Sequence, residues 1–423
     1  MRLSIVIPTR TRFEYLRHSL ACALSVPETD VEIVVSDNLS QDETPAYLAS
    51  LTDPRLRVVR PDRPLSMRQN FEFALKAARG DYVLFHGDDD AVLPQQIGAL
   101  LTLLDREKPD ALSWHFPVYG WPNPELAERL GNFRLLKSAT FGGITPLDVP
   151  HLRRALETAT LESLNFGPGL YHAVMKRAYI HEVLARDDGE CILSMSPDTY
   201  MTMRAILAGG RFIRVGHPFS INGYGHRSNG GSTKVAGNVK NEFSSFQSQA
   251  QQDPVRDVLP INKCVAFGYF NVLETLRHAF PEPALKLDLE RWYRRILYET
   301  SRRKDADERA AIIADVEFHA DNMGDPAALA RAKADLRPFR HKLAIRWAYN
   351  KNKWGSFRLD GAHAGTNTVA TAVARCDHVL GRDYEAVVAG RVSKTQAWRD
   401  AMKRKDGLDQ TDLNIPGREK HDA

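Results

Sequence analysis

The chain has 423 residues, of which 43% are hydrophobic and 26% are charged, and its formal net charge is +4. This length allows two domains, and so small a net charge does not favour a nucleic-acid-binding protein. No apolar run approaches the roughly 18–20 residues that a membrane-spanning helix needs, so we expect no such segment.

Strand and helix patterns alternate through the first hundred residues. Apolar strand patterns lie at 3–8, 31–37, 56–61 and 81–90. Amphipathic helix patterns lie between and after them, at 13–24, 66–80 and 94–109. Gly80 is a natural C-terminal stop, and Pro94 suits a first helical turn. Short apolar strands separated by helices predict a parallel α/β sheet.

The pattern loosens after Pro109. A strand is predicted at 111–121, a helix from Ser196 to Leu207 and a strand at 211–216, before a Gly-rich segment at 222–241 that is typical of a mobile loop. Beyond about residue 255 the apolar residues have helical spacing. We therefore predict an α/β domain over 1–250 and a mainly α-helical C-terminal region over 251–423. We also expect the first domain to fold without residues 346–423.

Charge and cysteine content bear on location. From Lys333 to Ala423 there are 18 Lys and Arg against 11 Asp and Glu. This basic tail indicates either a solvated helix surface, which is the simpler interpretation, or a peripheral contact with the inner face of a membrane. The four cysteines lack metal-binding spacing, and "RLSIVIP" after Met1 lacks the apolar core of a signal peptide. These features predict a cytoplasmic protein with reduced thiols.

Polar residues follow three of the predicted strands directly. Thr9 and Arg10 follow the first strand, Asp37 and Asn38 end the second, and the triplet 88–90 ends the fourth. Ligands of parallel α/β sheets bind outside the carboxyl ends of the strands. The three strand ends together therefore predict a binding site better than any one of them does, although an Asp-Asn pair alone is more often a turn.

The triplet Asp88-Asp89-Asp90 in "YVLFHGDDDAVLP" is the sharpest feature. Three adjacent carboxylates repel one another unless a positive charge lies opposite them. One interpretation is a solvated turn before the helix that begins at Pro94, where a helix dipole favours acids. The other is a site for Mg²⁺ or Mn²⁺, which commonly link one or two carboxylates to the phosphates of a substrate. The apolar strand before the triplet favours the metal site.

Several enzyme classes are disfavoured because their motifs do not occur in the sequence. The chain has no Walker sequence, no GxGxxG after the first strand, no zinc-ligand spacing and no GxSxG. These absences argue against a P-loop NTPase, a nicotinamide dehydrogenase, a zinc enzyme and an α/β-hydrolase.

Four segments together resemble the family 2 inverting glycosyltransferases of the GT-A fold. They are "IPTRTR" (7–12), "VVSDNLSQDET" (34–44), "MRQNFEFALKAARGDYVLFHGDDD" (67–90) and "SPDTYMTMRAI" (196–206). The resemblance covers roughly residues 1–225. It implies a nucleotide-diphospho-sugar transferase domain of Rossmann-like architecture, and a natural setting in cell-surface polysaccharide or glycolipid synthesis.

The resemblance also assigns residues. Contacts with the nucleotide side of the donor would come from Thr9, Asp37, Arg68, Asn70 and Asp88. Asp88 and Asp90 would stand for the metal-binding Asp-x-Asp of the family. Asp37 would contact the nucleotide base. Asn38 replaces the second acid that the family usually has at this strand end.

The resemblance places the catalytic base at Asp198, at the start of a helix. Inverting transfer needs a carboxylate that accepts the proton of the attacking acceptor hydroxyl. Judged without the family, Asp198 after Pro197 is better explained as a helix N-terminal cap. The family often has a Glu-Asp pair here, whereas "SPDTY" has no Glu.

The expected donor is a nucleotide-diphosphate sugar, UDP- or GDP-linked, and the expected acceptor is a saccharide or a lipid-linked molecule. His217, His226 and Arg227 lie on or near the Gly-rich segment, and either contact with phosphate or a solvated loop would suit them. The sequence leaves open the sugar, the acceptor and a homodimer. Two other functions remain: a sugar-phosphate nucleotidyltransferase, although "PTRTR" lacks its Gly-rich loop, and a non-catalytic binding module.

Overall fold

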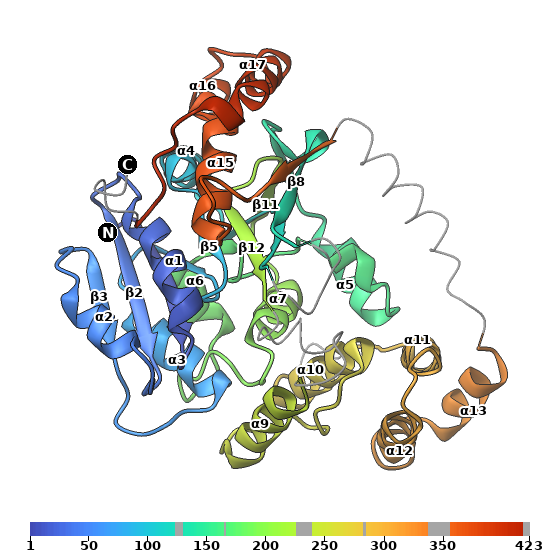
Figure 1. Ribbon diagram of the computed structural model, residues 1–423. Helices are drawn as coiled ribbons and strands as arrows, with labels where there is room; N and C mark the ends of the chain where they lie inside the picture. Colours follow the sequence, from blue (N-terminus) through green and yellow to red (C-terminus); the bar gives the residue numbers. More distant parts are fainter. Residues whose placement is uncertain (123–129, 165, 226–238, 282–284, 337–355, 418–423) are drawn as a thin grey trace.

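The computed structural model describes residues 1–122, 130–164, 166–225, 239–281, 285–336 and 356–417 (Figure 1). Its centre is an eight-stranded sheet in the order β3-β2-β1-β4-β10-β6-β11-β9. The strands of this sheet are β1 (Leu3–Thr9), β2 (Val31–Asp37), β3 (Leu56–Val59), β4 (Tyr82–Phe85), β6 (Ala111–Trp114), β9 (Ile144–Pro146), β10 (Ala173–Lys176) and β11 (Phe212–Val215).

The first half of this sheet is parallel, as predicted. Strand β1 pairs in parallel with β2 and β4, and β2 pairs in parallel with β3. Thr9 lies opposite Asp37, so the carboxyl ends of β1 and β2 reach the same edge. The later strands make the sheet mixed, because β10 runs antiparallel to both β4 and β6, and β9 runs antiparallel to β11.

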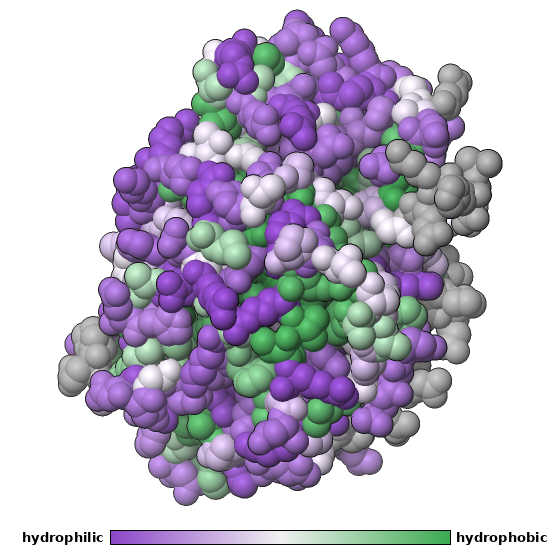
Figure 2. Space-filling model, turned by 90° about the vertical axis from the view of Figure 1, so that its left-hand side faces the viewer, coloured by the Kyte–Doolittle hydropathy of each residue, from purple (hydrophilic) through white to green (hydrophobic). Residues whose placement is uncertain are grey.

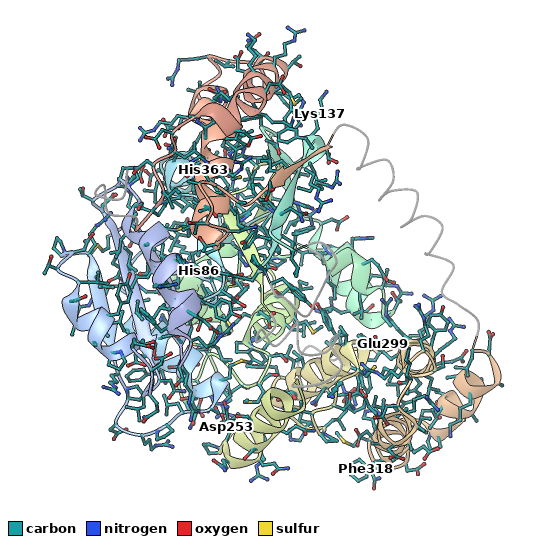
Figure 3. The ribbon with its side chains drawn as sticks, viewed as in Figure 1. His86, Lys137, Asp253, Glu299, Phe318 and His363 are labelled. Atoms are coloured by element: carbon teal, nitrogen blue, oxygen red, sulfur yellow. The ribbon has the colours of Figure 1, made fainter. Side chains whose placement is uncertain are left out.

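Two small sheets flank the central one. The first consists of β5 (Ala91–Val92), β12 (Ser220–Tyr224) and β7 (Val118–Gly120), and the second of β13 (Ser356–Asp360) and β8 (Asn132–Leu136). The predicted strand 81–90 is thus shorter, and the acid triplet forms a turn between β4 and β5. Figure 3 shows His86, which follows β4, beside helix α1 (Phe13–Leu24).

Each face of the sheet carries its own hydrophobic core. Ile5 and Ile7 of β1 belong to one core, and Val6 between them belongs to the other, because successive strand residues point to opposite faces. The helices of the first 225 residues are α1, α2 (Thr44–Ser50), α3 (Met67–Ala77), α4 (Ile97–Glu107), α5 (Val149–Glu157), α6 (Arg177–Tyr179) and α7 (Pro197–Ala208). Short helical turns occur at η1 (Pro94–Gln96), η2 (Lys137–Ala139), η3 (Leu161–Leu164) and η4 (Ile180–Leu184).

The predicted helical region follows the sheet domain and packs on it. Its helices are α9 (Val239–Gln252), α10 (Val265–Ala279), α11 (Leu289–Thr300), α12 (Ala306–Asn322) and α13 (Pro326–Ala334). The apolar stripes of α10 and α11 are buried in the core that also contains α3 and α7. None of the described helices is both long and apolar enough to cross a bilayer. Figure 2 shows one face of the molecule, mostly hydrophilic with an apolar area near its middle.

The last described segment returns to the sheet domain, and this differs from the predicted division at residue 250. It contains β13, α15 (Val369–Leu380), α16 (Asp383–Val388), α17 (Lys394–Asp406) and the turn η5 (Leu408–Gln410). Figure 1 shows these helices beside α4 and β5, on the other side of the molecule from α11–α13. Apolar residues of α15 share one core with α1 and α4.

Polar contacts also tie this segment to the sheet domain. Asp377 accepts hydrogen bonds from the Gln95 backbone N–H (3.1 Å) and from Gln96 Nε2 (2.9 Å). Tyr384 stacks on His217 with ring centroids 3.8 Å apart. Residues 356–417 therefore complete the first domain, and the expectation that this domain folds without residues 346–423 is not supported.

Candidate functional site

A cavity of about 710 Å³ opens at the carboxyl ends of β1 and β4. The residues after β1 and the acid turn form one wall, and the start of α7 forms another. The end of α9, the loop after it and the start of α10 enclose the far side. The predicted convergence of polar strand ends is therefore confirmed, with Asn38 representing the second strand, and the helical region adds a wall that the sequence did not indicate.

Thr9 lies on the cavity wall and fixes the acid turn. Its hydroxyl donates a hydrogen bond of 2.7 Å to Asp88 Oδ2. Both side chains are buried, with 3% and 2% exposure of the residues. Because β1 and β4 are adjacent parallel strands, a residue at the end of β1 meets the turn that follows β4.

Asp88 and Asp89 both line the cavity and share one cation, Arg12. The guanidinium Nη1 lies 3.0 Å from Asp88 Oδ1, and Nη2 lies 3.0 Å from Asp89 Oδ2. Burial raises the pKa of Asp89 to about 7, with the adjacent acids adding to the effect and Arg12 opposing it. The positive charge that the triplet requires is thus supplied at least in part by the chain itself.

Asp90 does not fit the role of a metal ligand that the resemblance implied. Its Oδ1 accepts hydrogen bonds from the Gly223 N–H (2.7 Å) and from Asn222 (3.2 Å). Its Oδ2 accepts from the Gly87 N–H (2.8 Å) and from the Tyr171 hydroxyl, and it lies 3.3 Å from His172 Nε2. Both oxygens are therefore occupied by protein donors.

The surroundings of Asp90 also account for its ionisation. The residue is fully buried and does not line the cavity. Burial alone would raise its pKa, but His172 and the hydrogen bond from Tyr171 outweigh burial and lower the pKa. Asp90 consequently holds the turn in shape, and the carboxylates that face the cavity are those of Asp88 and Asp89.

The residues of β2 and α3 divide between the cavity wall and the interior. Asn38 and Asn70 line the cavity, and Asn70 Oδ1 accepts a hydrogen bond of 2.7 Å from Ser36. Asp37, the expected contact of the nucleotide base, is buried behind them. Its Oδ1 accepts from the Ser40 N–H (2.9 Å), and Arg60 lies 3.5 Å from its Oδ2. The structure thus brings Asn70 to the site and leaves Asp37 just behind the wall.

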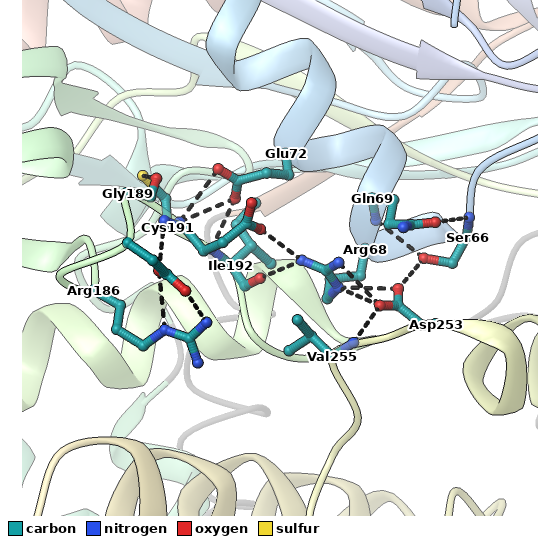
Figure 4. Close-up of polar contacts among 12 residues, drawn as sticks. Ser66, Arg68, Gln69, Glu72, Arg186, Gly189, Cys191, Ile192, Asp253 and Val255 are labelled. Atoms are coloured by element: carbon teal, nitrogen blue, oxygen red, sulfur yellow. Dashed lines mark hydrogen bonds and ion pairs between the residues drawn. The ribbon is translucent and has the colours of Figure 1, made fainter. Parts of the chain in front are cut away.

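Arg68, expected to contact the donor, does not line the cavity and lies in a buried network of polar contacts (Figure 4). Its Nη2 lies 2.9 Å from Asp253 Oδ1, and its Nη1 contacts Glu190 and the Ile192 carbonyl, each at 3.0 Å. Figure 3 shows Asp253 beside α9, where the helical region meets the sheet domain. The predicted contact of Arg68 with the nucleotide is therefore not supported, because its guanidinium links the helical region to the sheet domain.

Asp198 lies where the resemblance placed it, on the cavity wall at the start of α7. The residue is accessible within the cavity, yet protein surrounds it. Burial by these walls raises its pKa, while backbone N–H groups at the helix start oppose the rise. A carboxylate of raised basicity that remains accessible suits a general base.

The histidines and the arginine near the Gly-rich segment do not add to the described site. His217 is buried away from the cavity, where its Nδ1 accepts from the Phe141 N–H (3.2 Å) and its Nε2 lies 3.1 Å from Gln96 Oε1. Burial lowers its pKa well below the usual value, so it is a neutral packing residue. His226 and Arg227 lie outside the described residues.

The resident group that the resemblance implies is a divalent metal. Within the described ranges, no cluster of three or more His, Cys, Asp and Glu side chains could hold a metal by itself. The pair Asp88 and Asp89 still fits Mg²⁺ or Mn²⁺, because these ions commonly use one or two carboxylates and take their other ligands from phosphates and water. A fit therefore requires these two residues, not Asp90, together with a diphosphate.

Gly223 tests whether the shape of the acid turn matters. A Cβ atom added there would lie 1.6 Å from the Asp89 carbonyl oxygen, which is an impossible contact with backbone. We expect Gly223→Ala to displace the turn and weaken donor binding by about tenfold or more, as measured by calorimetry. Gly268→Ala is the matched control, since Gly268 lines the same cavity and its Cβ would meet nothing within 4 Å. Equal donor affinities for both variants would contradict the prediction.

A Rossmann-like sheet whose strand ends open into a cavity with paired carboxylates defines a GT-A domain. Residues 4–168 match the family model described as Glycosyl transferase family 2. Over these residues the chain carries a family 2 glycosyltransferase domain.

Curated relatives and solved structures show further similarity. The chain is 24% identical over 209 residues to the succinoglycan biosynthesis protein ExoO of Rhizobium meliloti, covering 49% of this chain and 57% of ExoO. It is 31% identical over 108 residues to the GalNAc(5)-diNAcBac-PP-undecaprenol beta-1,3-glucosyltransferase of Campylobacter jejuni, covering 25% and 34% of the two chains. The matches thus span less than two thirds of either relative. The structure of S. aureus TarS 1–349 in complex with UDP-GlcNAc aligns over 99% of this chain and 98% of that 1–349 chain, with 15% identity and a TM-score of 0.41.

Four parts of the site were missed from the sequence: Arg12, Asp89 as a cavity residue, Tyr171 and the wall from α10. Arg12 stands in the quoted "IPTRTR", so the need for a cation opposite the acids could have pointed to it. The wall from α10 had no local signal, because it depends on how the helical region packs.

Proposed function

We propose that the protein is an inverting glycosyltransferase that moves a sugar from a nucleoside-diphosphate sugar to a hydroxyl acceptor and depends on a divalent metal. One observation carries the proposal: a single cavity is lined both by the carboxylates of Asp88 and Asp89 and by Asp198. The cavity is of the size that small-molecule ligands occupy, about 300–1,000 Å³. The family 2 domain supports the same reaction.

In the proposed reaction Asp198 accepts the proton of the acceptor hydroxyl. The hydroxyl oxygen forms a bond to the anomeric carbon as the bond from that carbon to the diphosphate oxygen breaks on the opposite face. The configuration is therefore inverted, and the nucleoside diphosphate leaves with the bonding electron pair. Asp198 retains the proton until the product departs, and its raised pKa favours this proton transfer.

Asp88 and Asp89 are the residues that would hold Mg²⁺ or Mn²⁺. Such an ion supplies charge stabilisation for the leaving diphosphate when it is bound. Thr9 keeps Asp88 in place through its hydrogen bond, and Asp90 keeps the turn in place through its five donors. Asn38 and Asn70 extend the wall and present amide groups suited to polar contacts with the donor.

The acceptor proposed here is a saccharide or a lipid-linked saccharide. The names of the two relatives, which refer to succinoglycan biosynthesis and to glucosyl transfer to an undecaprenol-linked sugar, support this class. Other polar residues that line the cavity also support it, including Ser194, Asn262 and Asn271. All four cysteines are buried and free of disulfides, which supports a cytoplasmic location, with a peripheral position at the membrane as the setting for a lipid-linked acceptor.

A thermal-shift screen of UDP- and GDP-sugars, run with Mn²⁺ and then with chelator, tests the proposal. We expect one nucleotide sugar to raise the melting temperature with Mn²⁺ and to lose most of the effect with chelator. The same mixture with an acceptor should release nucleoside diphosphate. A protein that consumes a nucleoside triphosphate and a sugar phosphate and releases pyrophosphate would be a nucleotidyltransferase instead. Binding without any turnover would indicate a non-catalytic module.

A further inference from the structure

Arg12 occupies the position between the two carboxylates that face the cavity. Its two terminal nitrogens each lie 3.0 Å from one acid, so the guanidinium spans the pair as a fork. The side chains of Asp88 and Asp89 are 3% and 6% exposed, and that of Arg12 is 20% exposed. The bridging cation is thus sheltered, and it also borders the cavity.

Arg12 remains charged in this position. The guanidinium of arginine is not deprotonated in proteins, so its positive charge is fixed. A divalent ion on the same pair would place two further positive charges beside a fixed guanidinium, which repels them at this distance. Asp88 Oδ2 accepts a hydrogen bond from Thr9, and the other oxygen of Asp88 is the one that Arg12 contacts.

We propose that Arg12 is the resident counter-ion of Asp88 and Asp89, and that a divalent metal reaches these carboxylates only in exchange for the guanidinium. The inference rests on the proposed function, because it concerns the metal that the transfer reaction would use. Arg12 is a positioning residue in this scheme, since it acts through the two acids.

The exchange makes metal binding conditional on the donor. A metal that binds without donor must displace the Arg12 guanidinium, which then has no carboxylate partners. A diphosphate changes the balance in two ways, because its oxygens are further metal ligands and its negative charge attracts the released guanidinium. Metal and donor should therefore bind together, and the protein without donor should bind metal weakly.

Binding of Mn²⁺ to the full chain without nucleotide tests the exchange, with free Mn²⁺ followed by electron paramagnetic resonance. Arg12→Met removes the guanidinium that competes with Mn²⁺ for the two carboxylates. Because Mn²⁺ then no longer has to replace a charged hydrogen bond, its affinity should rise by about tenfold or more. Arg10→Met is the matched control. Arg10 lines the same cavity and is exposed, so its loss removes the same charge and should raise affinity by less than about threefold.

Arg12→Lys covers the case in which Arg12→Met does not fold. A single ammonium keeps the charge but cannot form a planar fork across two carboxylates, so Mn²⁺ affinity should exceed that of Arg10→Met. Unchanged affinity in the folded Arg12 variants, or an equal rise in Arg10→Met, would overturn the exchange. The measurement needs no transfer activity. Transfer that persists in chelator would instead contradict the metal dependence of the proposed function.

Discussion

Replacing Asp198 with Asn is expected to lower the transfer rate by about 10²–10⁴-fold, the usual contribution of a general base. The amide has nearly the same shape as the carboxylate but cannot accept the proton of the acceptor hydroxyl. The donor should bind as before, because the residues proposed to hold its diphosphate lie in the acid turn and not on α7. Steady-state turnover and calorimetric donor affinity together check both halves of this expectation.

Asp187→Asn is the control for charge alone, since Asp187 is exposed on the loop after η4. A normal rate for Asp198→Asn would remove the residue from the role of base. The pH profile of the wild type gives a second check. A base must be deprotonated, and burial raises the pKa of Asp198. As the pH is lowered, the rate should therefore begin to fall at a higher pH than it would with an Asp of ordinary pKa.

Deleting residues 356–423 is expected to abolish the soluble folded protein. The deletion removes β13 from β8 and uncovers the apolar residues of α1 and α4 that pack against α15. Each large apolar side chain left exposed costs about 1.5–3 kcal/mol, and a domain is stable by only about 5–15 kcal/mol in all. Solubility on expression and the circular dichroism of any recovered protein are the measurements.

A neighbouring pair on α17 gives a graded version of the same test. Trp398 is 8% exposed and packs on Phe357, with ring centroids 5.1 Å apart, so Trp398→Ala should cost about 3–5 kcal/mol in the free energy of unfolding. Arg399→Ala alters an exposed residue and should leave that free energy within about 0.5 kcal/mol. If the protein without residues 356–423 unfolds cooperatively at the temperature of the full chain, these residues are not part of the core of the first domain.

The sheet domain could be predicted where its signals are local. The alternation of apolar strands and amphipathic helices is enough to place β1, β2 and β4, and the rule for parallel strands brings Thr9 and the acid turn to one cavity. Asp198 followed from the resemblance, since a helix cap explains the same residue equally well. Strand β10 escaped prediction because it is only four residues long and lies in an irregular region.

The errors concern residues whose partners are distant in sequence. Arg68 is paired with Asp253, 185 residues away, and no local pattern indicates that pair. Asp90 was paired with Asp88 as the Asp-x-Asp motif of the family, but four of its five donors come from β12 and from the residues before β10. Which of three adjacent acids faces a cavity is decided by these donors, and the sequence does not show them.

The pairing of β13 with β8 has a consequence for biosynthesis. More than two hundred residues separate the two strands, so β8 leaves the ribosome long before its partner exists. Through that interval the apolar flanks of α1 and α4 have nothing to cover them, and a nascent chain in this state attracts chaperones and is prone to aggregate. The transferase domain can therefore be completed only after residues 356–417 have left the ribosome.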